Sequence, residues 1–147
     1  RNPYPIQILY VIIKHIFLRL EKILMRFAKK WGLVMKLKEL LESIDAEIIV
    51  DAGNLDTDIK CACGSDMMSD VLAYVKDQAV LLTGLNNPQV IRTADMMDML
   101  CVVYVRGKKP DALSLKLAVE KDICVLTTDK PLFTCCGILY DNGLRGA

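Results

Sequence analysis

The sequence predicts a three-layer α/β protein, with helices on both faces of a mainly parallel sheet of about four to six strands and an extra N-terminal helix. Short apolar runs such as 79–83 (AVLLT) and 101–105 (CVVYV) alternate with segments whose apolar residues recur at helical spacing. Runs that are apolar throughout are typical of strands buried on both faces, and strand–helix alternation favours parallel pairing. A length of 147 residues suits one domain, and a hydrophobic share of 53% excludes a disordered chain.

The first predicted elements lie between residues 36 and 75. A helix is expected over Lys36–Ile44, where apolar residues recur at i, i+3, i+4 and i+7. Strands are expected over Glu47–Val50 and Ile59–Cys63, with a turn-rich loop (51–58) between them. A further helix follows over 67–75, and Ser65 or Asp66 is expected to cap its N-terminus.

The second half of the chain alternates regularly. Strands are predicted over Ala79–Thr83, Cys101–Val105 and Cys124–Thr127. One helix is expected from Pro88 to about Met99, with an apolar side formed by Val90, Ile91, Ala94, Met96 and Met97. Asp111 is expected to cap the next helix over Ala112–Lys121, with Leu113, Leu117 and Ala118 inward. Pro131 is expected to begin the last helix, which ends near Gly143.

Residues 1–34 differ from the remainder in charge and pattern. They carry seven basic side chains and one acidic, whereas residues 35–147 carry 12 basic and 17 acidic. The apolar stretch 4–13 is too short to span a membrane, and Ile16, Leu20, Leu24, Phe27 and Trp31 follow at helical spacing. Three interpretations stay open for this basic amphipathic extension: a helix on an anionic membrane, a helix that packs on a partner, or upstream sequence added by an over-long gene model.

Charge and histidine content exclude several functions for residues 35–147, the body of the protein. Its acidic balance argues against a general nucleic-acid binder, which needs a basic face for phosphate contacts. The one histidine of the chain, His15, lies outside the body, so catalysis by a body histidine is excluded. Neither a P-loop nor a G-x-G-x-x-G fingerprint occurs. We therefore predict that the protein is not an enzyme and carries no cofactor.

Six cysteines all lie in the body, and we interpret them as reduced, packed thiols of a cytoplasmic protein. An alternative is a four-thiolate metal or redox site made by Cys61, Cys63, Cys135 and Cys136. Neither pair has the C-x₂-C spacing typical of structural zinc, so no metal ligands are predicted. Asp56 and Asp58 form a D-x-D pair that suits a cation, although such pairs are more often part of a solvated loop.

The best candidate ligand site lies in three loops that follow predicted strands. The loop Gly84–Asn87 leads into a helix N-terminus, where free backbone N–H groups favour an anion. If the strands are parallel, this loop meets the loops at 106–110 and 127–130 at one edge of the sheet, which suits phosphate. Asn86 and Asn87 as simple turn residues, and Arg106 and Lys108 as a solvated rim, are the alternative. The candidate ligand-binding residues are Thr83, Gly84, Asn86, Asn87, Arg92, Arg106, Gly107, Lys108, Thr127 and Thr128.

Three stretches of the body resemble a known family: 83–98 (TGLNNPQVIRTADMMD), 102–111 (VVYVRGKKPD) and 117–144 (LAVEKDICVLTTDKPLFTCCGILYDNGL). Together they resemble a DRTGG domain, related to the N-terminal domain of HPr kinase/phosphorylase, and above all the small stand-alone DRTGG proteins of anaerobic bacteria. The resemblance extends from Met35 to about Arg145, which favours Met35 as the natural start. The Asp-Arg-Thr-Gly-Gly sequence itself is absent; Thr83-Gly84 and Arg106-Gly107 stand at the corresponding loop positions.

This resemblance implies an α/β/α fold without an established activity. Relatives of this kind accompany CBS nucleotide-sensing modules or pyrophosphatase domains, lie at dimer contacts, and are often encoded beside hydrogenase subunits. The first hypothesis is therefore a non-enzymatic regulatory or scaffold module that forms a homodimer and binds a protein partner of a redox or hydrogenase-linked system. The alternative is a sensor of a nucleotide or another phosphate compound. Contact with nucleic acid is not expected, and contact with a membrane is expected only through residues 1–34.

Overall fold

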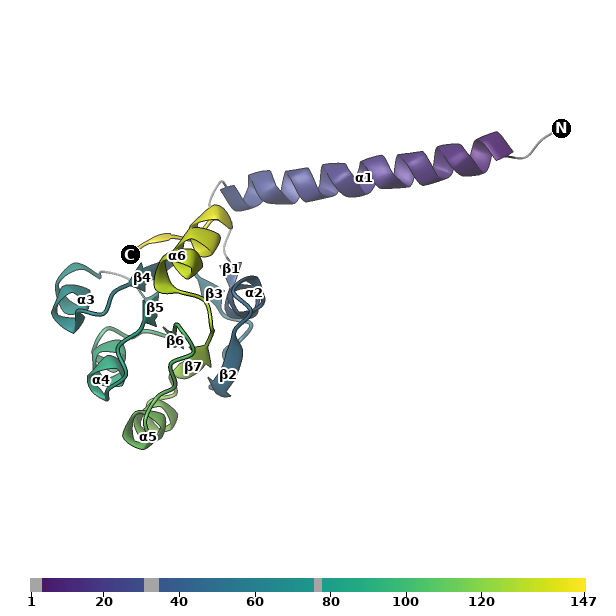
Figure 1. The fold of residues 1–147 in the computed structure, drawn as a ribbon. Helices are drawn as coiled ribbons and strands as arrows, with labels where there is room; N and C mark the ends of the chain where they lie inside the picture. Colours follow the sequence, from purple (N-terminus) through teal and green to yellow (C-terminus); the bar gives the residue numbers. More distant parts are fainter. Residues whose placement is uncertain (1–3, 31–34, 76–77) are drawn as a thin grey trace.

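The computed structural model describes residues 4–30, 35–75 and 78–147 of the chain (Figure 1). It contains the following elements in chain order: α1 (Tyr4–Lys30), β1 (Met35–Lys36), α2 (Leu37–Ser43), β2 (Glu47–Val50), β3 (Asp58–Ile59), β4 (Cys61–Gly64), α3 (Met68–Tyr74), β5 (Ala79–Thr83), α4 (Gln89–Met96), β6 (Cys101–Tyr104), α5 (Ala112–Glu120), β7 (Cys124–Thr127), α6 (Leu132–Asp141) and β8 (Arg145–Gly146).

Six strands form the main sheet in the order β2-β7-β6-β5-β4-β8. The strands β7, β6, β5, β4 and β8 are parallel to one another, and β2 pairs antiparallel with β7 at one edge. The expected α/β architecture with a mainly parallel sheet is thereby confirmed. The N-terminal helix that accompanies it is also present.

One predicted strand was wrong in its extent. Instead of a single strand over Ile59–Cys63, the chain forms β3, which pairs antiparallel with β1 in a separate two-stranded sheet, and then β4 in the main sheet. The loop before β3 is held on the start of α2, because the N–H groups of Leu37 and Lys38 donate to the carbonyl groups of Thr57 and Leu55. These contacts fix β3 beside β1 rather than in the main sheet.

Consecutive residues of the central strands point into two different hydrophobic cores, one on each face of the sheet. Val103 and Leu126 pack with α2 and α6, whereas Val102 and Val125 pack with α3, α4 and α5. Side chains of a strand alternate between its faces, so a strand that is apolar at every position serves both cores. Figure 1 shows the three layers that result.

Four helices end with the same C-terminal hydrogen bonds. In α2, α4, α5 and α6 the residue after the C-cap has a positive φ: Asp45 (49°), Asp98 (50°), Asp122 (52°) and Gly143 (104°). The next N–H donates to a carbonyl five residues back, for example from Ile123 to Ala118 at 2.9 Å. This is the Schellman motif, which normally places glycine at the left-handed position. Here three of the four positions are aspartate, which adopts that conformation at a small cost.

Helix ends and faces differ from the predictions in several places. Asp111 caps α5 as predicted, since its carboxylate accepts from the N–H of Ser114 at 2.7 Å. Neither Ser65 nor Asp66 occupies the N-cap position of α3, although both were predicted as caps. Asp66 instead accepts a hydrogen bond from the loop after β5. Leu113 is 48% exposed and Met96 is 68% exposed. Both were predicted to face inward. Helix α5 turns Ser114 inward, and α4 buries Val90, Ile91 and Ala94 as predicted.

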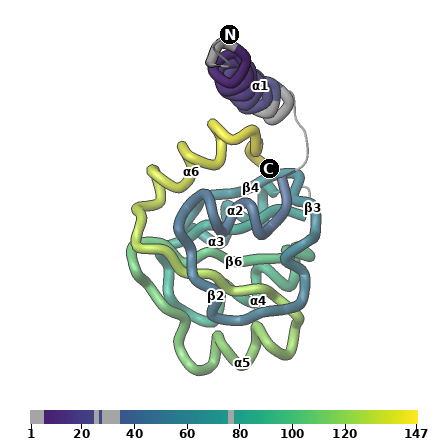
Figure 2. The backbone as a smooth tube through the Cα atoms, turned by 90° about the vertical axis from the view of Figure 1, so that its right-hand side faces the viewer, coloured from purple at the N-terminus to yellow at the C-terminus, as the bar shows by residue number. Residues whose placement is uncertain are grey.

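Helix α1 begins at Tyr4, well before the helical spacing that the sequence showed from Ile16 onward; Trp31, the last residue of that spacing, lies outside the described residues. Figures 1 and 2 show α1 extending away from the body, near the end of α6. Every α1 side chain that the structure describes is exposed. Within the described residues, no helix combines the length and apolar character needed to cross a membrane.

Candidate functional site

The carboxyl ends of β4, β5, β6 and β7 lie side by side at one edge of the sheet. Thr83 pairs with Tyr104, and Tyr104 pairs with Thr127, so the following loops leave the sheet at the same level. We call this region the carboxyl edge; it comprises residues 65–67, 83–88, 105–110 and 127–130, with 45–47 beside them at the start of β2. The predicted convergence of the three loops is confirmed, and their binding of a ligand stays a prediction.

Arg106 lies directly over the backbone of Gly84 at the carboxyl edge. A Cβ atom at position 84 would collide with the guanidinium group, so the absence of a side chain there admits Arg106. The Nη2 atom of Arg106 is 3.7 Å from Oδ2 of Asp66, and both side chains are about half exposed, at 52% and 49%. The ion pair is long and exposed to solvent, so it holds the guanidinium weakly.

Asp66 is held much more firmly by its other neighbours. Its Oδ1 accepts from the backbone N–H of Gly84 at 2.6 Å and from the hydroxyl of Thr83 at 3.0 Å. The Gly84 hydrogen bond is the main cause that lowers the pKa of Asp66, and Thr83 and Arg106 lower it further. The carboxylate is therefore ionised at neutral pH and joins the loops after β4 and β5.

The loop after β6 reverses in a tight turn with two left-handed residues. Arg106 has φ 58° and Gly107 has φ 66°, and the N–H of Lys108 donates to the carbonyl of Val105 at 3.2 Å. Such a turn prefers Asn-Gly or Gly-Gly, and an arginine in the left-handed region costs about 1 kcal/mol. Strain of this kind is common where a side chain must be presented in one direction.

The threonine hydroxyls at the carboxyl edge mainly hold the loops together. Thr127 donates to the carbonyl of Lys108 at 2.7 Å, and Thr128 donates to the carbonyl of Ile44 at 2.7 Å. Thr83 donates to Asp66. All three threonines are buried. These hydroxyls are therefore committed to protein acceptors, so a ligand would meet the side chains of the loops beyond them.

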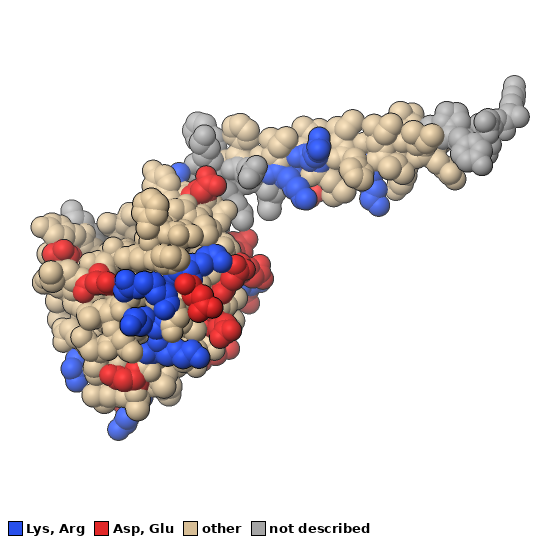
Figure 3. Space-filling view, in the orientation of Figure 1, with Lys and Arg blue, Asp and Glu red and all other residues tan. Residues whose placement is uncertain are grey.

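A polar hollow of about 230 Å³ opens beside these loops. Its walls combine the predicted residues Gly107, Thr127 and Thr128 with residues that were not predicted, namely Asp45, Glu47, Lys109 and Asp129. Lys130 pairs with Asp45 at the same place, 2.5 Å from Nζ to Oδ2. Figure 3 shows basic and acidic side chains close together on the visible face of the body. The hollow therefore has mixed charge, unlike the cationic site that the sequence led us to expect.

The remaining predicted residues lie farther along the loops and helices. Asn87 forms a turn, since its Oδ1 accepts from the N–H of Gln89 at 3.0 Å, and Asn86 is exposed. Lys108 is exposed beside Arg106, and Arg92 is exposed one turn into α4. The hydrogen bond of Asn87 therefore agrees with the alternative interpretation, in which Asn87 is a simple turn residue. The roles of Asn86, Lys108 and Arg92 toward a ligand stay predictions.

The cysteines and the D-x-D pair have local roles in the structure. None of the six cysteines forms a disulfide. Burial raises the pKa of Cys63, Cys135 and Cys136, so these thiols stay protonated at neutral pH. Across the described ranges of the chain, no three His, Cys, Asp or Glu side chains are grouped as metal ligands. Asp56 and Asp58 pair with Lys38 and Lys36, at 2.6 and 3.2 Å.

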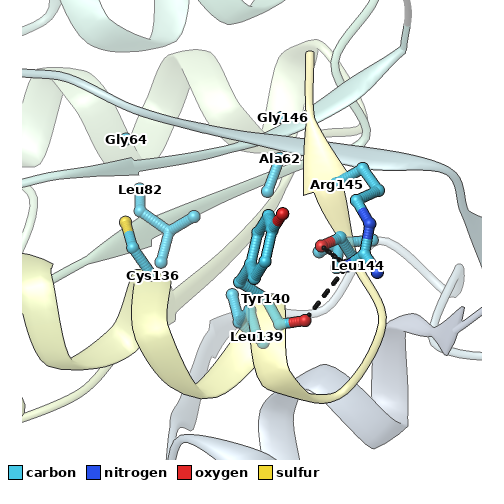
Figure 4. A pocket seen from close by; sticks show the side chains of 9 residues that line it. All are labelled: Ala62, Gly64, Leu82, Cys136, Leu139, Tyr140, Leu144, Arg145 and Gly146. Atoms are coloured by element: carbon cyan, nitrogen blue, oxygen red, sulfur yellow. Dashed lines mark hydrogen bonds between the residues drawn. The ribbon is translucent and has the colours of Figure 1, made fainter. Parts of the chain in front are cut away.

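A second hollow, of about 220 Å³, lies between α6 and the strands β4, β5 and β8 (Figure 4). Its lining is mostly apolar, including Leu82, Leu139 and Tyr140. The guanidinium of Arg145 lies 4.5 Å from the centre of the Tyr140 ring and donates to the Tyr140 carbonyl at 3.1 Å. The predicted ligand residues do not line this hollow, and its one charged side chain is engaged with Tyr140.

Sequence reasoning missed Asp66 as part of the site. It assigned Asp66 to a helix cap, although the residue follows β4 and thus belongs to the same set of loops as Gly84 and Arg106. The rule that loops after parallel strands meet at one edge would have included it, had the strand order been known. Asp45 and Glu47 could not be predicted for another reason. They join the carboxyl edge because β2 runs antiparallel to β7.

Comparison with protein-family models and with curated proteins finds no match to this chain. Among solved structures, the fold is similar to the CBS and DRTGG domains of the regulatory region of Clostridium perfringens pyrophosphatase, complexed with its activator diadenosine tetraphosphate. The TM-score is 0.61 at 16% sequence identity, and the match covers 73% of this chain and 46% of that chain. The chain thus spans less than half of that structure, and the likeness establishes a similar fold.

Proposed function

We propose that the protein is a non-catalytic regulatory module of the DRTGG type, which senses a phosphate-bearing small molecule, such as a nucleotide, at the carboxyl edge. The position of Arg106 is the observation that supports this proposal most strongly. Arg106 is presented over the bare backbone of Gly84, half exposed and joined to Asp66 by a long ion pair. A guanidinium group placed in this way is available to a better anionic partner.

A phosphate group is such a partner because its geometry matches a guanidinium. Phosphate oxygens accept two parallel hydrogen bonds from arginine, and the charge of a phosphate exceeds that of a single carboxylate. Asp66 does not lose its structural role when Arg106 moves, since Gly84 and Thr83 still donate to it. Binding would therefore exchange one weak ion pair for a stronger one without opening the loops.

The backbone conformation of Arg106 supports the same role. A left-handed arginine costs about 1 kcal/mol, and the following Gly107 carries no such cost. The strained turn directs the side chain across the loop after β5, where it meets Gly84. A strained backbone at Arg106 is expected if the side chain must be held in position to bind a ligand.

The absence of catalysis is part of the proposal. The sequence holds neither a P-loop nor a body histidine. The hydroxyls of Thr83, Thr127 and Thr128 donate to acceptors of the protein itself, which does not favour them as nucleophiles. The fold-level analogy supports the same conclusion, since the similar structure is a regulatory region in complex with its activator, diadenosine tetraphosphate.

The test is a thermal-unfolding screen of the full chain against inorganic phosphate, pyrophosphate, AMP, ATP and diadenosine tetraphosphate. A ligand at a hundred times its dissociation constant should stabilise the fold by about 2.7 kcal/mol. Arg106→Gln should abolish the shift, and Gly84→Ala should reduce it because the new Cβ displaces the guanidinium group. Lys116→Gln is the matched control, since Lys116 is an exposed cation on α5 that pairs with Glu120 of the same helix. Silence from every compound, or a shift that survives Arg106→Gln, rejects the proposal.

A second candidate function is partner binding, and the exposed face of α6 favours it. Phe133 is 90% exposed and Tyr140 is 63% exposed, and Gly137 lies between them on the same helical face with open space around it. Apolar groups in such a row suit a second copy of the chain or a protein partner of a redox system. Phe133→Glu should then dissociate a complex seen by sedimentation, and Leu113→Glu, an exposed apolar site on α5, is the matched control.

A further inference from the structure

Helix α1 leaves an unusual amount of apolar surface in water. Its described side chains are all exposed, including Ile6 at 77%, Phe17 at 67% and Leu24 at 66%. Figure 3 shows the helix as a mostly tan rod that stands away from the body. Burial of one large aliphatic or aromatic side chain contributes about 1.5–3 kcal/mol. A helix with so many such groups is therefore strongly favoured to meet an apolar surface.

Most of the large apolar residues of α1 form one continuous face. This face consists of Ile6, Leu9, Ile13, Ile16, Leu20, Ile23 and Phe27, which recur every three or four residues, with Phe17 and Leu24 beside them. At 3.6 residues per turn, no charged residue falls within this face. Arg19 lies on one border of the face, with His15 and Lys22 farther round on that side, and Glu21 lies on the other border, with Lys14 next to it.

We propose that α1 lies flat on an anionic lipid surface and tethers the body to it. An apolar face with long cationic side chains beside it is the pattern of an interfacial helix, because lysine and arginine stems lie along the apolar region while their charges reach the headgroups. The charges match this partner, since residues 1–34 carry seven basic side chains and one acidic. The helix does not reach the length and apolar character required to cross the membrane.

A second copy of α1 fits these observations less well. The apolar face has the spacing of a coiled-coil seam, so the charges of the helix decide between the two partners. Coiled coils pair Lys or Arg with Glu across the seam, and Glu21 is the only acidic residue of the helix. Anionic headgroups supply the missing negative charge on every side of the apolar face.

The test is co-sedimentation of the full chain with vesicles of phosphatidylglycerol and phosphatidylcholine, and with vesicles of phosphatidylcholine alone. The chain should bind the anionic vesicles much more strongly. Leu20→Glu places a charge within the apolar face and should weaken binding by about a hundredfold or more. Leu18→Glu makes the same chemical change two residues away on the opposite side, and should weaken binding much less.

A separate variant tests how much the cations of α1 contribute to vesicle binding. Arg19→Gln removes the cation on the border of the apolar face, which is expected to weaken binding to the anionic vesicles by about fivefold and to leave binding to neutral vesicles unchanged. All variants should share one thermal-unfolding midpoint, because α1 lies outside the body. Equal weakening by Leu20→Glu and Leu18→Glu, or no vesicle binding at all, overturns the proposal. If Leu20→Glu instead dissociates an oligomer in lipid-free solution, a second copy covers the apolar face.

Discussion

The carboxylate of Asp66 accepts a hydrogen bond from the backbone N–H of Gly84, with 2.6 Å between Oδ1 and N. This bond joins the loops after two neighbouring parallel strands, β4 and β5. It also places a negative charge next to the glycine over which Arg106 lies. One aspartate thus fixes a loop and sets the resting position of the cation that we propose as the ligand contact.

Asp66→Ala should therefore destabilise the fold and release Arg106. The variant leaves the N–H of Gly84 without its acceptor, and Thr83 loses the acceptor of its hydroxyl. Because the carboxylate is half exposed, water replaces part of the loss, and we expect the free energy of unfolding to fall by about 1 kcal/mol. Urea denaturation measures it. Asp66→Asn keeps an acceptor oxygen and should lose less; an unchanged midpoint for Asp66→Ala would contradict the structural role.

The depressed pKa of Asp66 predicts a pH dependence of stability. The folded protein favours the ionised carboxylate, so Asp66 contributes its full stabilisation above about pH 4, the ordinary aspartate value. That contribution is lost as the pH falls through the lower, folded-state pKa. The gap in unfolding free energy between the wild-type chain and Asp66→Asn should therefore shrink between pH 5 and pH 2. Urea titrations at several pH values measure this gap, and a constant gap would show that the pKa is not depressed.

The regular part of the fold was predictable because its signals are local. Runs such as 101–105 are apolar at every position, and two cores on opposite faces of the sheet require that pattern. The cap at Asp111 was found because its hydrogen bond to Ser114 spans three residues of sequence. The same signal failed at Asp66, where a partner 18 residues away, Gly84, takes the carboxylate instead.

The rest of the site depends on strand order, which no local pattern encodes. Glu47 reaches the carboxyl edge because β2 adds antiparallel to β7, and a four-residue strand carries no mark of its direction. The strands β1 and β8 have two residues each, too short for a periodic signal. The acidic side of the polar hollow, and with it the mixed charge of the site, could therefore not be expected from the sequence.

The hydroxyl of Thr128 should be important for stability although it lies at the candidate site. It donates to the carbonyl of Ile44 at 2.7 Å, and both residues are buried. Thr128→Val keeps the shape but leaves that carbonyl unpaired, so the free energy of unfolding should fall by about 1–3 kcal/mol. Thr128→Ser, which retains the hydroxyl, should lose less. A Thr128→Val protein as stable as the wild-type chain in urea would place water at the carbonyl instead.

The left-handed helix ends predict stabilising substitutions. Asp122 follows the C-cap of α5 with φ 52°, and Asp98 follows that of α4 with φ 50°. Glycine adopts this conformation without the Cβ conflict, as Gly143 does after α6, so Asp122→Gly and Asp98→Gly should each raise the free energy of unfolding by about 0.5–1 kcal/mol.

Asp122→Val is the matched opposite change. A β-branched side chain is strained in the left-handed region, so this variant should be less stable than the wild-type chain. Asp98 and Asp122 close different helices, so the gains of the two glycine variants should add in the double variant. Urea denaturation of the wild-type chain, Asp122→Gly and Asp122→Val measures the order Gly, Asp, Val at position 122, and the same measurement on Asp98→Gly and the double variant tests the additivity. Equal stability of Asp122→Gly and Asp122→Val would mean that the last turn of α5 does not hold the left-handed residue, and the Schellman hydrogen bond from Ile123 to Ala118 would then be absent in solution.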